Sequence, residues 1–148
     1  MDPLISGVAR TADSNDFKTV TTLLQSENLP IEDIVRELPH FFVIEDGNNV
    51  IAVGGLEVYG NDGLVRSMIV DPNYRNRSLA AILLNKLQEY AAEQGITALY
   101  LITTTAREYF AKKGFKAIAR EEVSSSLASS REFSTLCPST ATVMMRKL

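Results

Sequence analysis

A chain of 148 residues with 45% hydrophobic and 22% charged residues has the size and composition of one globular domain. Its net charge of −3 argues against a general nucleic-acid-binding protein, which would usually carry a basic surplus. No apolar run approaches the roughly 20 residues that span a bilayer, and Met1-Asp2-Pro3-Leu4 lacks the basic and apolar regions of a signal peptide. We therefore expect a single domain over residues 1–148, located in the cytoplasm, monomeric or homodimeric, without nucleic-acid or membrane partners.

The N-terminal half predicts an edge strand, two helices and a three-stranded meander. Asp13, or Ser14 beside it, is a suitable N-cap for a helix whose apolar residues follow at helical spacing over residues 17–24. Pro30 and Pro39 bound a second short helix. The predicted ranges are 5–9 for the edge strand, 31–38 for the second helix, and 41–44, 50–58 and 64–70 for the meander.

In the C-terminal half the apolar period changes from two to about 3.6 residues. One helical face carries the apolar residues between Leu79 and Ala91, and Gly95 ends this helix. A buried strand over 98–102, a short helix over 106–113 and closing strands over 115–119 and 143–148 follow. The long helix should connect the third meander strand to residues 98–102 as a parallel, right-handed crossover. The predicted fold class is α+β, a mixed central sheet with helices on both faces.

The most informative segment is the loop between the third meander strand and the long helix, which carries Arg75 and Arg77. The first N–H groups of a helix have no partner within the helix and lie at the positive end of its dipole. A phosphate placed there meets several donors, and the two arginines would add positive charge. The alternative is that both arginines are ordinary solvated loop residues.

This segment resembles motif A of the GNAT acetyltransferases, in which a strand ends near Val-Asp-Pro and Q/R-x-x-G-x-G/A opens a helix. Arg75 fills the first position of the motif and Ala80 the last, whereas Ser78 stands where the family usually has glycine. Serine can crowd the approach of the backbone to the phosphates, or its hydroxyl can donate to one of them. The resemblance implies the GNAT acyl-CoA N-acyltransferase fold, with acetyl-CoA as cosubstrate. It assigns the pyrophosphate to Arg75, Asn76, Arg77, Ser78, Leu79 and Ala80.

Four further segments extend the resemblance over nearly the whole chain, and they are most similar to the N-acetyltransferases of arsenic-resistance operons. These are residues 55–60, residues 101–106, Tyr109-Phe110 before residues 113–115, and residues 131–133 followed by 136–138. The resemblance implies a small-molecule amine as acceptor, such as an amino-acid-like arsenical or a related phosphinic acid. Arg66 or Arg131 would pair with an acidic group of that substrate, and Cys137 would be packed or lie beside it.

The family resemblance implies direct attack of a neutral amine on the thioester, with the backbone of Met68, Ile69 and Val70 binding the pantetheine arm. Glu57 interrupts an apolar strand and is our candidate for the proton relay, because desolvation beside a cleft can raise the pKa of a carboxylate toward the working pH. Tyr59 lies two residues on, hence on the same strand face, and would complete a water chain or bind substrate. The alternative for Glu57 is a position on the solvent face of the strand.

The proton for the leaving thiolate has no donor of the usual form. The tyrosine that many family members place four residues before the Gly-Phe pair is Phe110 here, and the adjacent Tyr109 should point elsewhere. Thr104 or Thr105 would serve instead, or water would. The alternative for these threonines is a strand end followed by a helix N-cap.

No other chemistry is indicated by the composition. One cysteine and one histidine, Cys137 and His40, form no recognisable nucleophile pair and make a transition-metal site improbable. The competing functions are acetylation of a protein N-terminus and a CoA-binding sensor or interaction module without catalysis.

Overall fold

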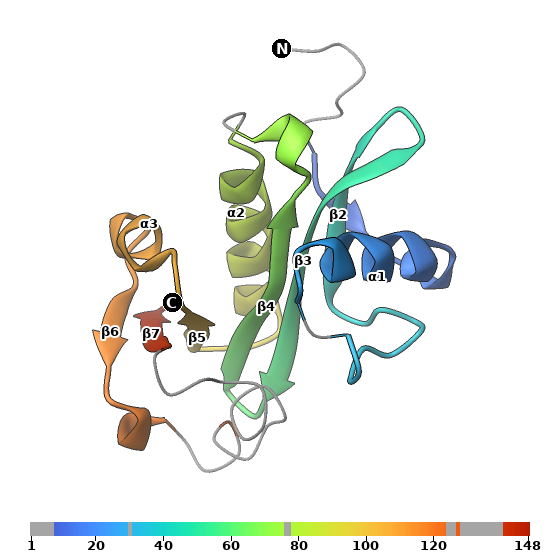
Figure 1. Ribbon diagram of the computed structural model, residues 1–148. Coiled ribbons are helices and arrows are strands. Elements are labelled where there is room, and N and C mark those ends of the chain that lie inside the picture. The colour runs from blue at the N-terminus through green and yellow to red at the C-terminus, as the bar shows by residue number, and fades with distance from the viewer. Residues whose placement is uncertain (1–7, 30, 76–77, 124–126, 128–140) are drawn as a thin grey trace. The chain divides into compact units, whose positions relative to one another are not determined.

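The computed structural model describes residues 8–29, 31–75, 78–123, 127 and 141–148 (Figure 1). The strands are β1 (Arg10–Thr11), β2 (Phe41–Asp46), β3 (Asn49–Tyr59), β4 (Asp62–Val70), β5 (Ala98–Thr103), β6 (Lys116–Ile118) and β7 (Thr142–Lys147). The α-helices are α1 (Phe17–Ser26), α2 (Leu79–Glu93) and α3 (Arg107–Lys112), and the 3-10 helices are η1 (Ser14–Asp16), η2 (Pro72–Tyr74) and η3 (Arg120–Glu122). No helix in these ranges is long and apolar enough to cross a membrane.

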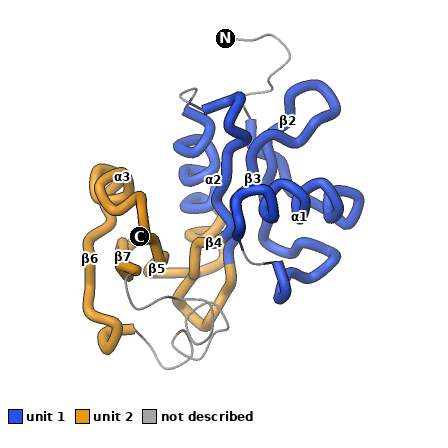
Figure 2. Tube along the Cα trace, viewed as in Figure 1, with its two compact units in different colours: residues 1–56, 67–89 blue, residues 57–66, 90–148 orange. Residues whose placement is uncertain are grey.

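The strands of the described chain form a mixed sheet with the order β1-β2-β3-β4-β5-β7-β6. β4 and β5 are parallel, as expected for strands that a helix connects, and β5 pairs with β7 in antiparallel fashion. The predicted α+β class and the parallel crossover are therefore confirmed. The chain divides into two compact units, residues 1–56 with 67–89 and residues 57–66 with 90–148, here called unit 1 and unit 2 (Figure 2).

In unit 1, a capping box starts the segment that leads into α1. The Asp13 carboxylate accepts from the N–H of Asn15, and the Asp16 carboxylate accepts from the N–H of Asp13, both at 2.9 Å. Arg10 on β1 donates to both oxygens of Asp16, at 2.8 and 2.9 Å, and through Nε to Glu45 at 2.6 Å. These contacts hold the start of α1 against the edge of the sheet. Asp13, one of the two residues predicted as N-cap, caps η1, which leads directly into α1, whereas the N-cap of α1 itself is Asp16.

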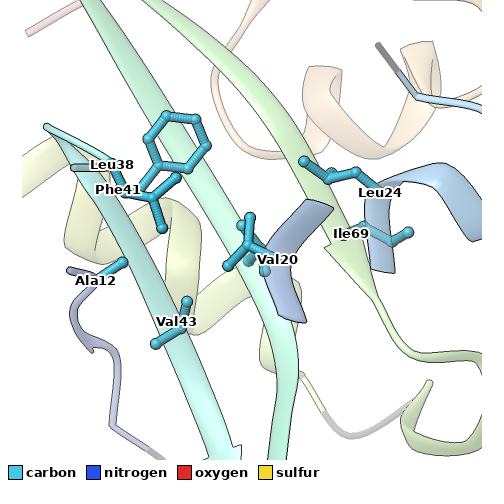
Figure 3. Close-up of a cluster of buried hydrophobic side chains, with 8 residues drawn as sticks. Ala12, Val20, Leu24, Leu38, Phe41, Val43 and Ile69 are labelled. Atoms are coloured by element: carbon cyan, nitrogen blue, oxygen red, sulfur yellow. The ribbon is translucent and has the colours of Figure 1, made fainter. Parts of the chain in front are cut away.

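The two helices of unit 1 cover opposite faces of its strands. α1 packs on one face of the sheet through a cluster of buried side chains from the helix, the strands and the adjoining loops (Figure 3), made of Ala12, Val20, Leu24, Leu38, Phe41, Val43, Val53 and Ile69. Successive strand residues point to opposite faces, so Gly54 faces away from this cluster. A Cβ on Gly54 would lie 2.7 Å from Met68 Sδ and 3.2 Å from Leu87 Cδ1. Glycine is therefore required here because α2 approaches β3 closely.

Unit 2 has its own small core, made of Leu64, Tyr100 and Leu127 with partly buried apolar neighbours. The antiparallel β6–β7 pair extends this part of the sheet, with Ala117 opposite Met144. Gly114 ends α3 with φ +94, and its neighbour Lys113 accepts from Arg146 Nη1 at 2.7 Å through its backbone carbonyl. The end of α3 is thus fixed against β7.

Two sequence-based predictions of elements were wrong. Residues 31–38 do not form a helix but two separate turns. In the first turn the N–H of Ile34 donates to the carbonyl of Ile31, and in the second the N–H of Leu38 donates to the carbonyl of Val35. A short helix gains little from its own hydrogen bonds, and here packing of the isoleucines and Leu38 on the unit 1 core decides the conformation. The edge strand lies at Arg10–Thr11, after the predicted range 5–9, of which 5–7 are outside the described residues.

Candidate active site

The second half of β4 begins with a residue in an unusual backbone conformation. Ser67 has φ +57, in the left-handed region that non-glycine residues seldom adopt. Strained backbone conformations of this kind cluster at functional sites. Met68, Ile69 and Val70, the residues predicted to bind a pantetheine arm, directly follow Ser67 in β4.

The loop after β4 is fixed at several points within unit 1. The Asp71 N–H donates to the carbonyl of Ile51 at 2.8 Å, and the Asp71 carboxylate caps η2 by accepting from Asn73 N–H at 2.9 Å. The Tyr74 hydroxyl donates to the Asp46 carboxylate at the end of β2. These bonds hold the backbone that leads into Arg75.

Ser78 caps the N-terminus of α2 in a conformation suited to glycine. Its φ is +61, and its carbonyl accepts from Ile82 N–H at 3.1 Å. Leu79 follows as a buried residue and Ala80 is half-buried. The first N–H groups of a helix have no partners within the helix, so those of the first turn of α2 are suited to phosphate oxygens. Serine at this position thus adopts the backbone that a family glycine would provide, and its exposed side chain does not pack into the core.

Arg75, three residues before Ser78 in the sequence, already has an anionic partner. Its guanidinium Nη2 donates to Glu27 Oε1 at 2.5 Å, and the two side chains are 55% and 35% exposed. The predicted phosphate residues Asn76 and Arg77 lie outside the described residues. Lys86, further along α2, has its Nζ 5.7 Å from the centre of the Phe42 ring.

In unit 2, three of the predicted site residues form one hydrogen-bonded group on β3 and β4. The Tyr59 hydroxyl donates to Glu57 Oε2 at 2.6 Å, and Arg66 Nη1 donates to Glu57 Oε1 at 3.0 Å. The Arg66 side chain is only 3% exposed, whereas that of Glu57 is 26% exposed. A buried guanidinium requires a counter-charge, and Glu57 provides it. The prediction that Glu57 and Tyr59 share a strand face is confirmed by their hydrogen bond.

The threonines after β5 have distinct environments. Thr103 ends β5, and its Oγ1 accepts from the N–H of Ala106 at 2.9 Å; Ala106 is the N-cap of α3, so none of the threonines caps that helix through its side chain. Thr104 is exposed in the bend that follows β5. The Phe110 ring makes edge-to-face contacts with Tyr109 at 5.2 Å and with Phe115 at 5.8 Å between ring centres. Burial raises the pKa of the Tyr109 hydroxyl.

Arg131 and Cys137, the remaining predicted substrate residues, lie outside the described residues. Among the residues described, no group of three His, Cys, Asp or Glu side chains could hold a metal ion. Sequence analysis missed the contact of Glu27 with Arg75, because 48 residues separate the two and neither belongs to a common local motif. It also missed the pairing of Arg66 with Glu57, although opposite charges on two strands joined by a short turn are a usable signal.

A family model described as the acetyltransferase (GNAT) family matches residues 10–115, which is more than half of the chain. The chain therefore belongs to the GNAT family of acetyltransferases, whose acetyl donor is acetyl-CoA. The fold agrees with this family. An N-acetylglutamate synthase from Neisseria gonorrhoeae, solved with coenzyme A and N-acetyl-glutamate, superimposes with a TM-score of 0.83 at 19% identity, over 100% of this chain and 36% of that chain. Rv2747 from Mycobacterium tuberculosis, solved with CoA, superimposes with a TM-score of 0.80 at 20% identity, over 95% of this chain and 99% of that chain.

Amino-acid acetyltransferases are among the curated relatives that match. The protein from Photorhabdus laumondii is 32% identical over 57% of this chain and 19% of its own length. That from Pseudomonas fluorescens is 30% identical over 66% of this chain and 23% of its own length. The chain thus spans about a fifth of the length of these relatives. They lend no support to the arsenic-resistance subfamily that the sequence motifs indicated.

Proposed function

We propose that this chain is an acetyl-CoA-dependent N-acetyltransferase, a single domain that transfers the acetyl group directly to the amine of a small, amino-acid-like molecule. One observation carries the proposal. The loop between β4 and α2 combines a left-handed cap at Ser78, the N–H groups that open α2, and the guanidinium of Arg75. This arrangement suits an anion such as a pyrophosphate.

On the donor side, the pyrophosphate of CoA would lie against the first turn of α2. Arg75 would contribute a charge-assisted hydrogen bond, and the backbone of residues 68–70 would bind the pantetheine arm. The left-handed backbone of Ser67 supports this assignment, because non-glycine residues in this conformation cluster at ligand and active sites. The roles of Asn76 and Arg77 in the same loop remain predictions from the motif.

On the acceptor side, Glu57 would take the proton of the attacking amine, either directly or through the Tyr59 hydroxyl that donates to it. Arg66 would act on Glu57 instead of on the substrate, because its buried guanidinium is already matched by that carboxylate. Arg66 is then a positioning residue. Recognition of an acidic group on the substrate would fall to Arg131, with Cys137 beside it.

In the reaction, the amine nitrogen forms a bond to the acetyl carbon while the carbon–sulfur bond of the thioester breaks. The amine proton goes to Glu57, and the CoA thiolate takes a proton from Thr104 or from water. Negative charge develops on the carbonyl oxygen, where backbone N–H groups of residues 68–70 would stabilise it. Phe110 cannot supply a proton, which favours the exposed Thr104 or solvent in that step.

The nature of the acceptor is proposed from the relatives, which are amino-acid acetyltransferases. We expect an α-amino acid or a close analogue, and we keep amino-acid-like arsenicals and phosphinic acids within this class. An acceptor in the form of a protein N-terminus is the second possibility.

The test is a release assay for free thiol with acetyl-CoA and a panel of amines. The panel contains the protein amino acids, arsenical and phosphinic analogues, and a short peptide with a free N-terminus. Thiol release that depends on one amino-acid-like amine, with the acetylated product identified by mass spectrometry, is the expected result. CoA binding without thiol release from any member would favour the sensor function, and absence of CoA binding would refute the proposal.

A further inference from the structure

We infer that Glu27 is an internal competitor for the cofactor, because its carboxylate holds the Arg75 guanidinium that the CoA pyrophosphate would need. This inference rests on the proposed function, since it takes Arg75 as a phosphate residue. Glu27 lies at the end of α1, outside every motif that the sequence suggested for the site. The contact is a 2.5 Å hydrogen bond between Arg75 Nη2 and Glu27 Oε1.

The backbone on the Glu27 side of this pair is held in place by the end of α1. Asn28 adopts φ +60, its N–H donates to the carbonyl of Gln25 at 3.0 Å, and the N–H of Leu29 donates to the carbonyl of Leu24 at 3.0 Å. This pattern is a Schellman motif, which fixes the chain direction after a helix. Glu27 is the residue between the helix and this motif, so its side chain starts from a defined position.

The position of Glu27 is not explained by the stability of α1. A carboxylate at the C-terminal end of a helix lies at the negative end of the helix dipole, where a cation would be favourable. Asp16, by contrast, lies at the N-terminal end of α1, where the dipole favours it. An unfavourable charge at the helix end that is compensated by Arg75 is consistent with a function for the pair itself.

The backbone on the Arg75 side is equally constrained. Arg75 directly follows η2, whose Tyr74 is bonded to Asp46 and whose cap is Asp71. The guanidinium therefore has two alternative anionic partners, the carboxylate and a phosphate at the start of α2. A carboxylate and a phosphate both accept the planar fork of an arginine. Binding of CoA must break the pair with Glu27 before the phosphate gains the full interaction.

The expected effect of Glu27 on CoA affinity is small because both side chains of the ion pair are exposed. The Arg75 and Glu27 side chains are 55% and 35% exposed, and an exposed ion pair contributes little free energy in water. Removing the Glu27 charge should therefore tighten CoA binding by about two- to fivefold. The gain should decrease as salt is added, because exposed charges are screened over about 10 Å at 0.1 M ionic strength.

The experiment measures the dissociation constant for CoA by calorimetry in four proteins: the unaltered chain, Glu27→Gln, Arg75→Ala and the double variant. We expect Glu27→Gln to bind more tightly, and to have no effect when Arg75 is already alanine. Glu89→Gln is the matched control, since it removes the same charge from an exposed site on α2. It should leave the dissociation constant unchanged.

Unchanged or weaker binding by Glu27→Gln would overturn the inference, with weaker binding meaning that Glu27 instead orients Arg75 for the cofactor. An equal gain in Glu89→Gln, or a gain that persists without Arg75, would overturn it as well, because net charge alone would then explain the change. If the unaltered chain binds no CoA, the proposed function fails and this inference falls with it. If it binds CoA but Glu27→Gln behaves like the unaltered chain, only the inference fails.

Discussion

Replacing Glu57 with glutamine separates the chemical role of this side chain from its structural role. Glutamine keeps the shape and a carbonyl oxygen that can accept from Arg66 Nη1 and from the Tyr59 hydroxyl. It loses the negative charge that matches the buried guanidinium, and it cannot take a proton at neutral pH. The variant should therefore fold with reduced stability and transfer the acetyl group slowly.

The loss of stability can be bounded from the geometry of the pair. Removing one partner of a buried ion pair costs about 3–5 kcal/mol. Glu57 is 26% exposed and glutamine retains an acceptor, so we expect about 1–2 kcal/mol. For a domain of this size each kcal/mol lowers the melting temperature by about 2–4 °C, so the midpoint should fall by about 2–8 °C. The variant stays folded at room temperature, where activity is compared.

The rate of acetyl transfer should fall by about 10²–10⁴-fold, the usual range for a general acid–base group. The affinity for CoA should stay nearly constant, because Glu57 lies outside the cofactor loop. The acidic limb of the pH–rate profile should disappear, since the group that must lose its proton is no longer present. Thiol release at saturating CoA, thermal melting and calorimetry together measure these three quantities. Glu108→Gln, an exposed carboxylate on α3, is the control.

Two outcomes would refute the reasoning. A Glu57→Gln variant that is active with an unaltered pH profile would remove Glu57 from the proton path. A loss of activity that accompanies a fall in the melting temperature much larger than 8 °C would mean that the ion pair with Arg66 is a structural requirement.

Three further predictions concern unit 1. Arg75→Ala should weaken CoA binding by about tenfold, as expected for the loss of a charge-assisted hydrogen bond, while Lys86→Ala should change it little. Calorimetry measures both dissociation constants, and equal effects would mean that CoA is attracted by the general positive charge and not by a defined site. Ser78→Gly should keep the affinity for CoA, whereas Ser78→Val should lower both affinity and melting temperature, because a β-branched residue is strained at φ +61; a valine variant with unaltered binding would contradict this. Arg10 lowers the pKa of Asp16 below its ordinary value of 3.8 by hydrogen bonding, so its stabilisation is complete above that pH and is lost as the pH falls through the folded pKa. Asp16→Asn should therefore lower the free energy of unfolding in urea by about 1–2 kcal/mol at pH 7, and by less in acid. Because the Arg10 side chain is 39% exposed, the pair could instead be an ordinary surface contact, and an unchanged free energy of unfolding at pH 7 would indicate this.

The sequence by itself determined most of the fold, because most elements have strong local signals. The short apolar runs of β2 to β4 between turn residues, the apolar face of α2 and the glycine that ends it each indicate one type of element. The exception is residues 31–38, which carry the same apolar spacing as a helix but form turns, since their apolar side chains gain more by packing on the core than by local hydrogen bonds.

The candidate site was predictable to the extent that its chemistry is local. The loop from Arg75 to Ala80 is contiguous, and Glu57 and Tyr59 share a strand face by spacing alone. The conformation of Ser78 was left open, because residue type gives only a preference for positive φ; the structure decides that serine adopts it.

Tertiary structure alone decided which charges meet. Glu57 joins Arg66 through the pairing of two strands, and Glu27 joins Arg75 across 48 residues of sequence. Each of these side chains has several possible partners of opposite charge along the chain. The short turn between β3 and β4 is a local signal for the pair of Glu57 and Arg66, whereas no local signal connects Glu27 with Arg75. The packing of α1 and α2 on the sheet brings one pair within hydrogen-bonding distance in unit 1, and the hairpin of β3 and β4 does so in unit 2. The fold thereby pairs an exposed loop arginine with a glutamate at the end of α1, and makes a strand glutamate the counter-ion of a buried cation.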